Sequence, residues 1–155
     1  MIIAVRELSN LDVRDAKLGD AEAIARLMTD LGYPSSPESM RRRFEHIFSN
    51  SAYHTLVADH GGHVIGMAGI ETGHYYEVDE SYARISAFVV AHRYRRLGVG
   101  KALLLAAESR ARRIGAGNVF LNSGSHRPGA HRFYEESGYS VTGYRFYKNL
   151  EGPGA

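Results

Sequence analysis

A basic segment with two glycines, residues 90–101, is the part of the sequence best suited to chemistry. It reads VAHRYRRLGVGK, follows an apolar run typical of a buried strand, and opens a stretch with helical periodicity. The first turn of a helix has N–H groups without intrahelical partners and carries the positive end of the helix dipole. Gly98 and Gly100 let a phosphate approach the backbone, and the segment has no acidic residue. We therefore predict a phosphate-bearing ligand here; the alternative is an exposed basic patch at an ordinary helix start.

Two common phosphate-binding patterns do not fit this segment. The dinucleotide pattern Gly-x-Gly-x-x-Gly fails because Leu103 stands where the third glycine should be. The Walker pattern fails because Gly100-Lys101 is followed by Ala102 and because its first glycine is replaced by Arg95. The ligand is therefore neither a Rossmann-bound dinucleotide nor a P-loop nucleotide.

Hydrophobic periodicity predicts the elements that must position the segment. Strands are expected over residues 11–17, 53–59, 64–75, 82–90, 118–122 and 139–150, and helices over 20–31, 36–48, 98–114 and 130–137. Asp20 and Ser36 have side chains typical of N-cap residues, and Gly32 stands where the first helix should end. This order of elements predicts an α/β layered domain with one mixed sheet flanked by helices.

Composition limits the classes of function. The 155 residues are 44% hydrophobic and 23% charged, which is ordinary for a globular domain. The net charge of +2 is too balanced for a general nucleic-acid binder. No run of about 18 apolar residues suggests a membrane span, and the opening residues MIIAVRELSN lack the features of a secretory signal. The absence of cysteine excludes a disulfide framework and a thiol acyl-enzyme, and it fits the cytoplasm.

The spacing Arg95-x-x-Gly98-x-Gly100 resembles the acetyl-CoA loop of the GNAT superfamily of N-acetyltransferases. Residues 20–26 look like the first helix of that family, and residues 133–139, FYEESGY, look like its late helix-to-strand signature. The resemblance covers nearly the whole chain. We therefore interpret residues 1–155 as a single domain of this family, with a core over about residues 11–150 and its GNAT-like α/β fold.

The resemblance implies where acetyl-CoA, the co-substrate, would bind. The backbone of Phe88, Val89 and Val90 would pair with the pantetheine arm where their strand splays from its neighbour. The main-chain amides that would hold the pyrophosphate are those of Arg95, Arg96, Leu97, Gly98, Val99, Gly100 and Lys101. Tyr134 would lie near the sulfur of coenzyme A and serve as the general acid. Family members usually transfer the acetyl group directly to an amine, and the absence of cysteine agrees with this.

The general base is less clear from the sequence. An amine of the lysine type, with a pKa of about 10.4, must lose a proton before it attacks. Many relatives place a glutamate on the strand before the loop, but Ala87 stands at that position here. Glu71 is the first substitute because it is the only acid on the predicted strand 64–75, although an exposed strand carboxylate is the competing interpretation. The other candidates, in or near the following turn, are His74, Glu77, Asp79 and Glu80.

Arg127 is a second departure from the family pattern, because many relatives have a cofactor-contacting asparagine at its position. We keep Arg127 as a candidate for cofactor binding. The local sequence, SHRPGAHRFY, resembles a bacterial subgroup that includes aminoalkylphosphonate and aminoglycoside-type acetyltransferases. His126 and His131 have poor spacing for one helical face and lack an evident third ligand, so no metal site is expected.

The sequence thus predicts a cytoplasmic enzyme that transfers acetyl from acetyl-CoA to a primary amine. A small-molecule acceptor is preferred, such as an amino sugar or aminoglycoside, a polyamine or an aminoalkylphosphonate, and a protein amine is second. A non-catalytic acyl-CoA-binding regulatory module is the competing class, because position 87 lacks an acid. No nucleic acid or membrane partner is expected, and a homodimer stays open. The tyrosines that are candidates to line an acceptor cleft are Tyr33, Tyr53, Tyr75, Tyr76 and Tyr82.

Overall fold

The computed structural model describes residues 8–152, so residues 1–7, part of the stretch in which no secretory signal was expected, lie outside it together with residues 153–155. The chain divides into two compact units after Leu121. The first contains β1 (Leu11–Asp15), η1 (Leu18–Asp20), α1 (Ala21–Leu31), α2 (Pro37–Phe48), β2 (Tyr53–His60), β3 (His63–His74), β4 (Ser81–Val90), η2 (His92–Tyr94), α3 (Val99–Arg113) and β5 (Ala116–Leu121), where η marks a short 3-10 helix. The second contains α4 (Pro128–Glu136). No helix within residues 8–152 has both the length and the apolar character needed to cross a bilayer.

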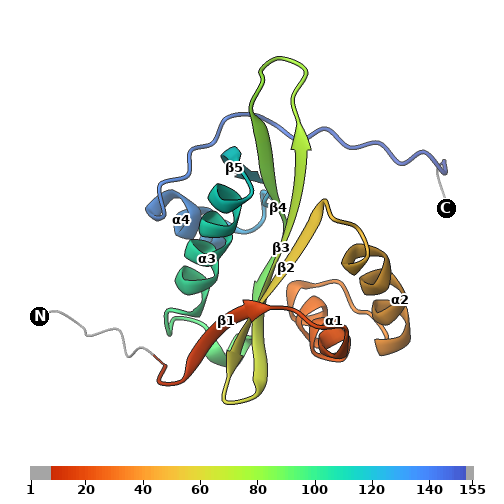
Figure 1. Cartoon of the computed structure of the whole chain (residues 1–155), viewed down its shortest axis with the longest axis vertical. Coiled ribbons are helices and arrows are strands. Elements are labelled where there is room, and N and C mark those ends of the chain that lie inside the picture. Colours follow the sequence, from red (N-terminus) through yellow and green to blue (C-terminus); the bar gives the residue numbers. More distant parts are fainter. Residues whose placement is uncertain (1–7, 153–155) are drawn as a thin grey trace, which may run out of the picture. The chain divides into compact units, whose positions relative to one another are not determined.

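The strands of the first unit form one mixed sheet in the order β1-β2-β3-β4-β5 (Figure 1). Neighbouring strands from β1 to β4 are antiparallel, whereas β4 and β5 run parallel. The β2–β3 hairpin turns through Gly61 and Gly62, whose φ angles of 58° and 89° lie in the left-handed region that favours glycine. A parallel pair needs a crossover connection, and α3 supplies it between β4 and β5. The predicted α/β architecture with a mixed sheet is confirmed.

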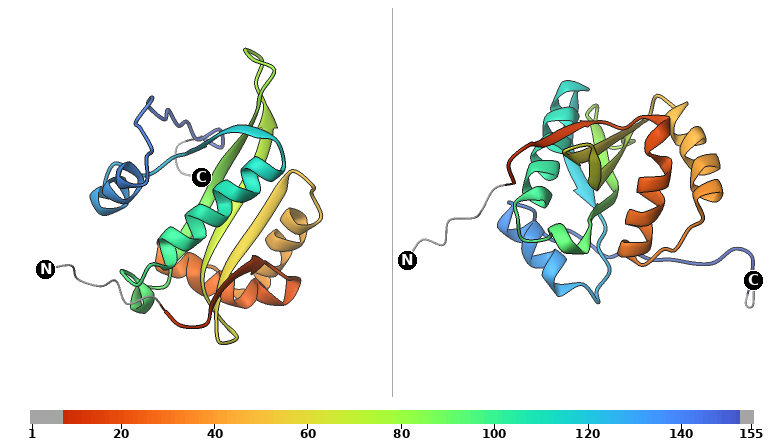
Figure 2. Two further views of the ribbon diagram at one scale, coloured as in Figure 1. Left: turned by 60° about the vertical axis from the view of Figure 1, so that its left-hand side comes forward. Right: turned by 90° about the horizontal axis from the view of Figure 1, so that it is seen from below.

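Helices cover both faces of this sheet (Figure 2). On one face α1 contacts β3 and β4 and α2 contacts β2, while α3 contacts every strand from the other face. Met67 and Val89 face α1 and α2 and belong to one buried cluster with them. On the opposite face Gly66 makes room for α3, because an added Cβ would lie 2.9 Å from Leu103 Cδ1 and 3.5 Å from Val99 Cγ1. The sheet is therefore the middle layer of three.

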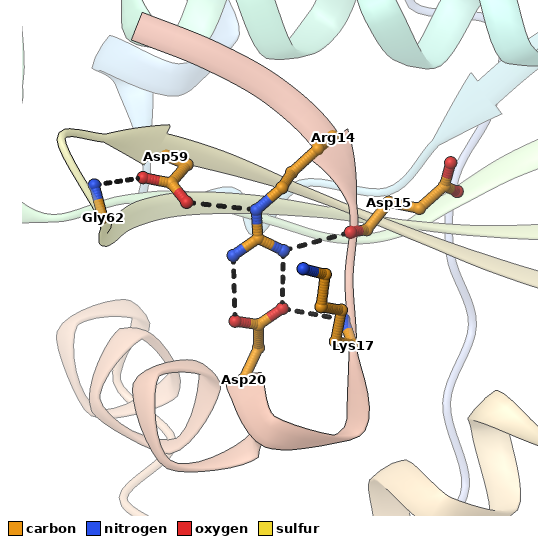
Figure 3. A network of polar contacts seen from close by, with 6 residues as sticks. All are labelled: Arg14, Asp15, Lys17, Asp20, Asp59 and Gly62. Carbon is orange, nitrogen blue, oxygen red and sulfur yellow. Dashed lines mark hydrogen bonds and ion pairs between the residues drawn. The ribbon is translucent and has the colours of Figure 1, made fainter. Parts of the chain in front are cut away.

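The two predicted N-caps behave differently. Ser36 caps α2 as expected, because its Oγ accepts a first-turn N–H at 3.1 Å. Asp20 stands at the N-cap position of α1 as expected, but its side chain makes no cap hydrogen bond there, so that part of the prediction was wrong. Its carboxylate instead accepts the Lys17 N–H at 2.7 Å and two hydrogen bonds from Arg14 at 2.9 and 3.1 Å (Figure 3). Arg14 also donates to Asp59 Oδ2 at 3.0 Å. The bidentate charge-assisted pair with Arg14 outweighs a local cap here and joins β1 to η1, whereas the bond to Asp59 ties β1 to the end of β2.

The predicted strand over residues 139–150 is absent, so this prediction was wrong as well. The helix α4 ends at Glu136, the turn that follows it contains Gly138 with a φ of 92°, and residues 139–150 form no strand. An extended segment becomes a strand only beside a partner that takes up its N–H and C=O groups. The alternating sequence indicates the capacity to form a strand, but it does not supply that partner.

Candidate functional site

The strand β4 separates from β5 partway along its length. Its pairing with β5 ends at Ile85, opposite Leu121, whereas β4 itself continues to Val90. Ser86 is an extra residue in β4 at this point, because the residues on either side of it pair with consecutive residues of β3. Residues 88–90 thus lie beyond the last β4–β5 pair, which is the local geometry expected of the predicted pantetheine site.

The connection from β4 to α3 is held in a fixed conformation. The Ala91 N–H donates to the Ile65 carbonyl at 2.8 Å, so the start of the connection stays at the sheet. After η2, Arg95 folds back and its Nε donates to the Val90 carbonyl at 3.0 Å. The guanidinium of Arg95 therefore fixes the loop by binding a main-chain oxygen at the end of β4.

The first turn of α3 presents amides that precede the helical ladder. The ladder begins with the bond from the Ala102 N–H to the Gly98 carbonyl at 3.1 Å. Gly98 has a φ of 83°, and a Cβ added there would meet nothing within 4 Å, so the backbone is open to a ligand. Arg96 also has a positive φ of 61°, a strained conformation that tends to occur at ligand sites. The exposed basic side chains around this turn are Arg93, Arg95, Arg96 and Lys101. Backbone, dipole and side chains thus all suit a diphosphate.

Glu71 lies in a row that crosses three strands. It stands opposite Tyr53 of β2 and Arg84 of β4, and it shares the sheet face of Met67, which is covered by α1 and α2. Arg84 Nη1 is 3.5 Å from Glu71 Oε2, and the two side chains are 33% and 27% exposed. Along β3, Glu71 is one same-face step, about 7 Å, from the residue that pairs with Ala87. A carboxylate thus lies close to Ala87, the position at which the family resemblance led us to expect a glutamate.

The other candidates for the base lie away from this row. His74 is the exposed last residue of β3, and Glu77 and Asp79 are exposed in the turn that follows. Glu80 is exposed and turned toward β5, because a Cβ added to Gly117 would lie 2.6 Å from its Oε2. Of the predicted carboxylates, Glu71 is the one that lies on a strand of the sheet.

An aromatic cluster adjoins this row. The ring centroids of Tyr75 and Tyr82 are 4.9 Å apart, and those of Tyr82 and Phe120 are 5.2 Å apart. Tyr75 Oη donates to Asn118 Oδ1 at 2.9 Å, and Phe120 stands opposite Arg84 in the β4–β5 register. Sequence reasoning missed Phe120. The available signal was its spacing of two residues from Asn118 on the predicted strand, which puts both side chains on the same face of the sheet. Two predicted cleft residues are instead largely exposed to solvent, Tyr33 and Tyr76.

Tyr134 and Arg127 belong to the second unit. The helix α4 ends in a Schellman turn, in which the Tyr139 N–H donates to the Tyr134 carbonyl at 3.0 Å. This turn sets the Tyr139 ring edge-on to that of Tyr134, with centroids 5.9 Å apart. Burial raises the pKa of the Tyr134 phenol, and the positive charge of Arg127 acts in the opposite direction. Tyr134 therefore keeps its proton at neutral pH, as a general acid must.

The histidines of this unit have local contacts. His131 Nε2 is 2.8 Å from the Gly124 carbonyl oxygen, and a Cβ added to Gly124 would lie 2.6 Å from His126 Cε1. In residues 8–152, no three side chains of the His, Asp and Glu types form a group that could hold a metal ion.

Comparison with known proteins identifies the class of enzyme. The family model described as "Acetyltransferase (GNAT) family" matches residues 21–139, from the first residue of α1 to just beyond α4. The chain belongs to this family, so the resemblance noted in the loop and in the late signature is confirmed. It is an N-acetyltransferase with acetyl-CoA as its co-substrate.

Individual proteins agree with this assignment in length and fold. The aminoalkylphosphonate N-acetyltransferase of Salmonella typhimurium is 28% identical over 149 residues, which cover 96% of this chain and 94% of that protein. A GNAT family acetyltransferase of known structure from Staphylococcus aureus is 29% identical, with a TM-score of 0.81 over 92% of this chain and 100% of that one. A transcriptional regulator from Bacillus halodurans shares the fold, with a TM-score of 0.84 and 24% identity over 90% and 99% of the two chains.

Proposed function

We propose that acetyl-CoA binds along the part of β4 that lies beyond β5, with its diphosphate at the start of α3. The backbone of residues 88–90 pairs with the amide-containing pantetheine arm, and the amides of residues 95–101 hold the diphosphate. The observation that carries this proposal is the end of β4–β5 pairing at Ile85, on the strand that leads directly into the glycine-opened start of α3.

We assign Glu71 as the general base and Tyr134 as the general acid. The free amine attacks the thioester carbonyl carbon, and the proton lost by its nitrogen goes to Glu71, directly or through water. The C–S bond breaks with its electron pair on sulfur, and the thiolate takes the Tyr134 proton. Because burial raises the pKa of Tyr134, the phenol still holds that proton at neutral pH. Exchange with solvent then returns both residues to their initial states. Arg127 stays a candidate for the phosphates of coenzyme A.

The acceptor is a small primary amine that also carries a negative group. The Glu71 carboxylate and the Arg84 guanidinium lie 3.5 Å apart on one sheet face, so together they match a ligand with neighbouring positive and negative charges. Arg84 would repel a polyamine, whose charges are all positive. The similar enzyme from Salmonella typhimurium acts on aminoalkylphosphonates, and its name supports this class of acceptor.

Binding and chemistry are tested separately. Titration calorimetry measures acetyl-CoA binding, and thiol release measures turnover with 2-aminoethylphosphonate, glucosamine 6-phosphate, an aminoglycoside, spermidine and a lysine peptide. We expect binding, with the fastest release from the amines that carry phosphonate or phosphate. Refusal of acetyl-CoA would overturn the binding site. Binding without release from any amine would favour the regulatory module that Ala87 suggests, and fastest release with spermidine or the peptide would remove the role of Arg84.

We also place the enzyme in the cytoplasm of a bacterium. The support is the bacterial source of the similar proteins named above and the cysteine-free sequence. Fractionation of a bacterium that expresses the tagged chain checks this, and recovery of the chain outside the cytoplasmic fraction would contradict it.

A further inference from the structure

The connection from β4 to α3 contacts three other elements just before the proposed diphosphate site. The Ala91 N–H donates to the Ile65 carbonyl of β3 at 2.8 Å. The His92 N–H donates to Asp30 Oδ2 of α1 at 3.4 Å. The third contact comes from His60, the last residue of β2. All of these residues belong to the first compact unit.

His60 meets the connection at Tyr94. The two ring centroids are 6.0 Å apart and the ring planes are inclined by 69°, which is the edge-to-face arrangement that aromatic pairs favour. The guanidinium carbon of Arg93 lies 5.6 Å from the Tyr94 ring centroid, within the range of a cation–π contact. His60 Nδ1 is buried and has no hydrogen-bond partner within residues 8–152. His60 therefore acts on Tyr94 through its ring rather than through a hydrogen bond from Nδ1.

His60 itself stands at a rigid corner of the sheet. It pairs with both neighbouring strands, β1 and β3. The two residues of the β2–β3 turn are glycines with positive φ, as a type I′ turn requires. Asp59 closes this corner, because its Oδ1 accepts the Gly62 N–H at 2.7 Å and its Oδ2 accepts the Arg14 Nε–H at 3.0 Å (Figure 3). The position of the His60 ring is therefore set by the sheet.

The residues that follow Tyr94 form the loop that must be ordered for a diphosphate to bind. Arg96 and Gly98 both have a positive φ, 61° and 83°. A loop that is free before binding loses conformational freedom when the ligand arrives, which weakens affinity, whereas a preorganised loop avoids this loss. Tyr94 is the residue at which the connection enters the loop, so a contact that holds its ring also restricts the loop.

We propose that His60 is a positioning residue for acetyl-CoA. Through the ring of Tyr94 it holds the connection in the conformation in which the amides of residues 95–101 face the diphosphate. His60 then touches neither the cofactor nor the acceptor, so it acts on the affinity for acetyl-CoA and leaves the acyl transfer unchanged. This role rests on the acetyl-CoA site proposed above.

Titration calorimetry with acetyl-CoA tests this role. His60→Ala removes the ring and should raise the Kd about 3- to 10-fold, the worth of one aromatic pair. His60→Phe keeps a ring and lacks the unpaired nitrogen, so it should bind acetyl-CoA as the unchanged chain does. The matched control is His63→Ala, because His63 is an exposed histidine that pairs with His60 across the turn, and its Kd should not change. An unchanged Kd in His60→Ala, or an equal rise in His60→Phe, would overturn the proposal.

An acetyl donor without the diphosphate separates positioning from a general loss of structure. Acetyl-pantetheine has the thioester and the pantetheine arm but no phosphate. With the amine that gives the fastest thiol release, His60→Ala should raise the KM of acetyl-CoA and leave both kcat and the KM of acetyl-pantetheine unchanged. Equal effects on the two donors would show that His60 supports the fold as a whole, and they would refute the positioning role.

Hydrogen exchange in the free protein keeps this result apart from that of the proposed function. The Tyr94 N–H donates to the Ala91 carbonyl at 2.9 Å, and the Arg95 N–H donates to the His92 carbonyl at 3.3 Å. These two amides should exchange faster in His60→Ala than in the unchanged chain, whereas the amides of α2 should not change. Equal exchange at the two amides would refute the role of His60 even where acetyl-CoA binds. Refusal of acetyl-CoA by the unchanged chain would overturn the proposed site, and the positioning role with it.

Discussion

Arg14 joins β1 to η1 and to the end of β2, and its removal should destabilise the first unit measurably (Figure 3). The change Arg14→Met keeps much of the side-chain length but removes the charge and the donors. It leaves the carboxylates of Asp20 and Asp59, whose side chains are 13% and 18% exposed, without their cationic partner. Exposed ion pairs contribute at most about 1 kcal/mol, whereas loss of one partner from a fully buried pair costs about 3 to 5 kcal/mol. For this partly buried cluster we expect a loss of about 2 kcal/mol in the free energy of unfolding.

This loss should depend on pH with a defined sign. Hydrogen bonds from Arg14 lower the pKa of Asp20 below its ordinary value, so the folded state favours the ionised carboxylate. A carboxylate whose pKa is lower in the folded state than in the unfolded state stabilises the fold. This contribution is fully present above the pKa of the unfolded state, and it is lost as the pH falls through the pKa of the folded state. The difference between the unchanged chain and Arg14→Met should therefore be constant from neutral pH to about pH 5, and it should shrink below about pH 4.

Thermal and urea unfolding followed by circular dichroism measure this effect. A loss of about 2 kcal/mol lowers the Tm by about 4 to 8 °C for a chain of this size. The matched control is Arg26→Met, because Arg26 makes an exposed ion pair with Glu22 on α1 and should contribute about 0.5 kcal/mol or less. Equal losses in the two variants, or an Arg14→Met difference that persists undiminished at pH 3, would refute this account of the cluster.

Four further predictions concern the catalytic proposal. Tyr134→Phe should lower kcat by about 100-fold or more while leaving the acetyl-CoA Kd unchanged, and wild-type turnover would exclude Tyr134 as the acid. Because its pKa is raised above 10.0, the unchanged enzyme should show no loss of kcat from Tyr134 ionisation below about pH 10 in a pH–rate profile. Glu71→Gln should lower the rate most at low pH, where the free amine is scarce, and an effect that is flat with pH would remove Glu71 as the base. Arg84→Gln should raise the KM of a phosphonate-bearing amine about 10- to 100-fold but leave unchanged the KM of an amine that carries no anionic group. Equal effects on the two KM values would argue against a contact between Arg84 and the phosphonate.

The conformation of the connection between β4 and α3 could be predicted from sequence because its determinants are local. The apolar end of β4, the basic connection and Gly98 follow one another along the chain. The left-handed φ of 83° at Gly98 can be expected from the residue type alone, because glycine readily adopts a positive φ. The behaviour of Asp20 could not be predicted in this way. An N-cap depends only on residues that are close in the sequence. Arg14 binds both Asp20 and Asp59, and its contact with Asp59 exists only once β1 and β2 have paired in their observed register.

The error over residues 139–150 has a different origin. Alternation reports which side chains of a strand share a face, and it carries no information on which strand edge completes the ladder. The aromatic cluster of Tyr75, Tyr82 and Phe120 shows the same limit, because Phe120 comes close to Tyr82 only through the parallel pairing of β4 with β5. The cluster therefore depends on sheet topology, which a reading of one segment at a time does not contain.

A single backbone irregularity, the extra residue at Ser86, determines both parts of the proposed site. Ala87 packs against the α1–α2 cluster, and in a regular strand Ile85 would share its face. The bulge shifts the phase, so Ile85 is buried toward α3 and Arg84 faces the α1–α2 side beside Glu71. In the regular register the Arg84 charge would be buried under α3 without a partner, at a cost of several kcal/mol, so the sequence itself selects the bulged register. Because the β4–β5 pairing ends at this same point, the opening proposed for acetyl-CoA lies next to Arg84, the β4 member of the charge pair proposed for the acceptor.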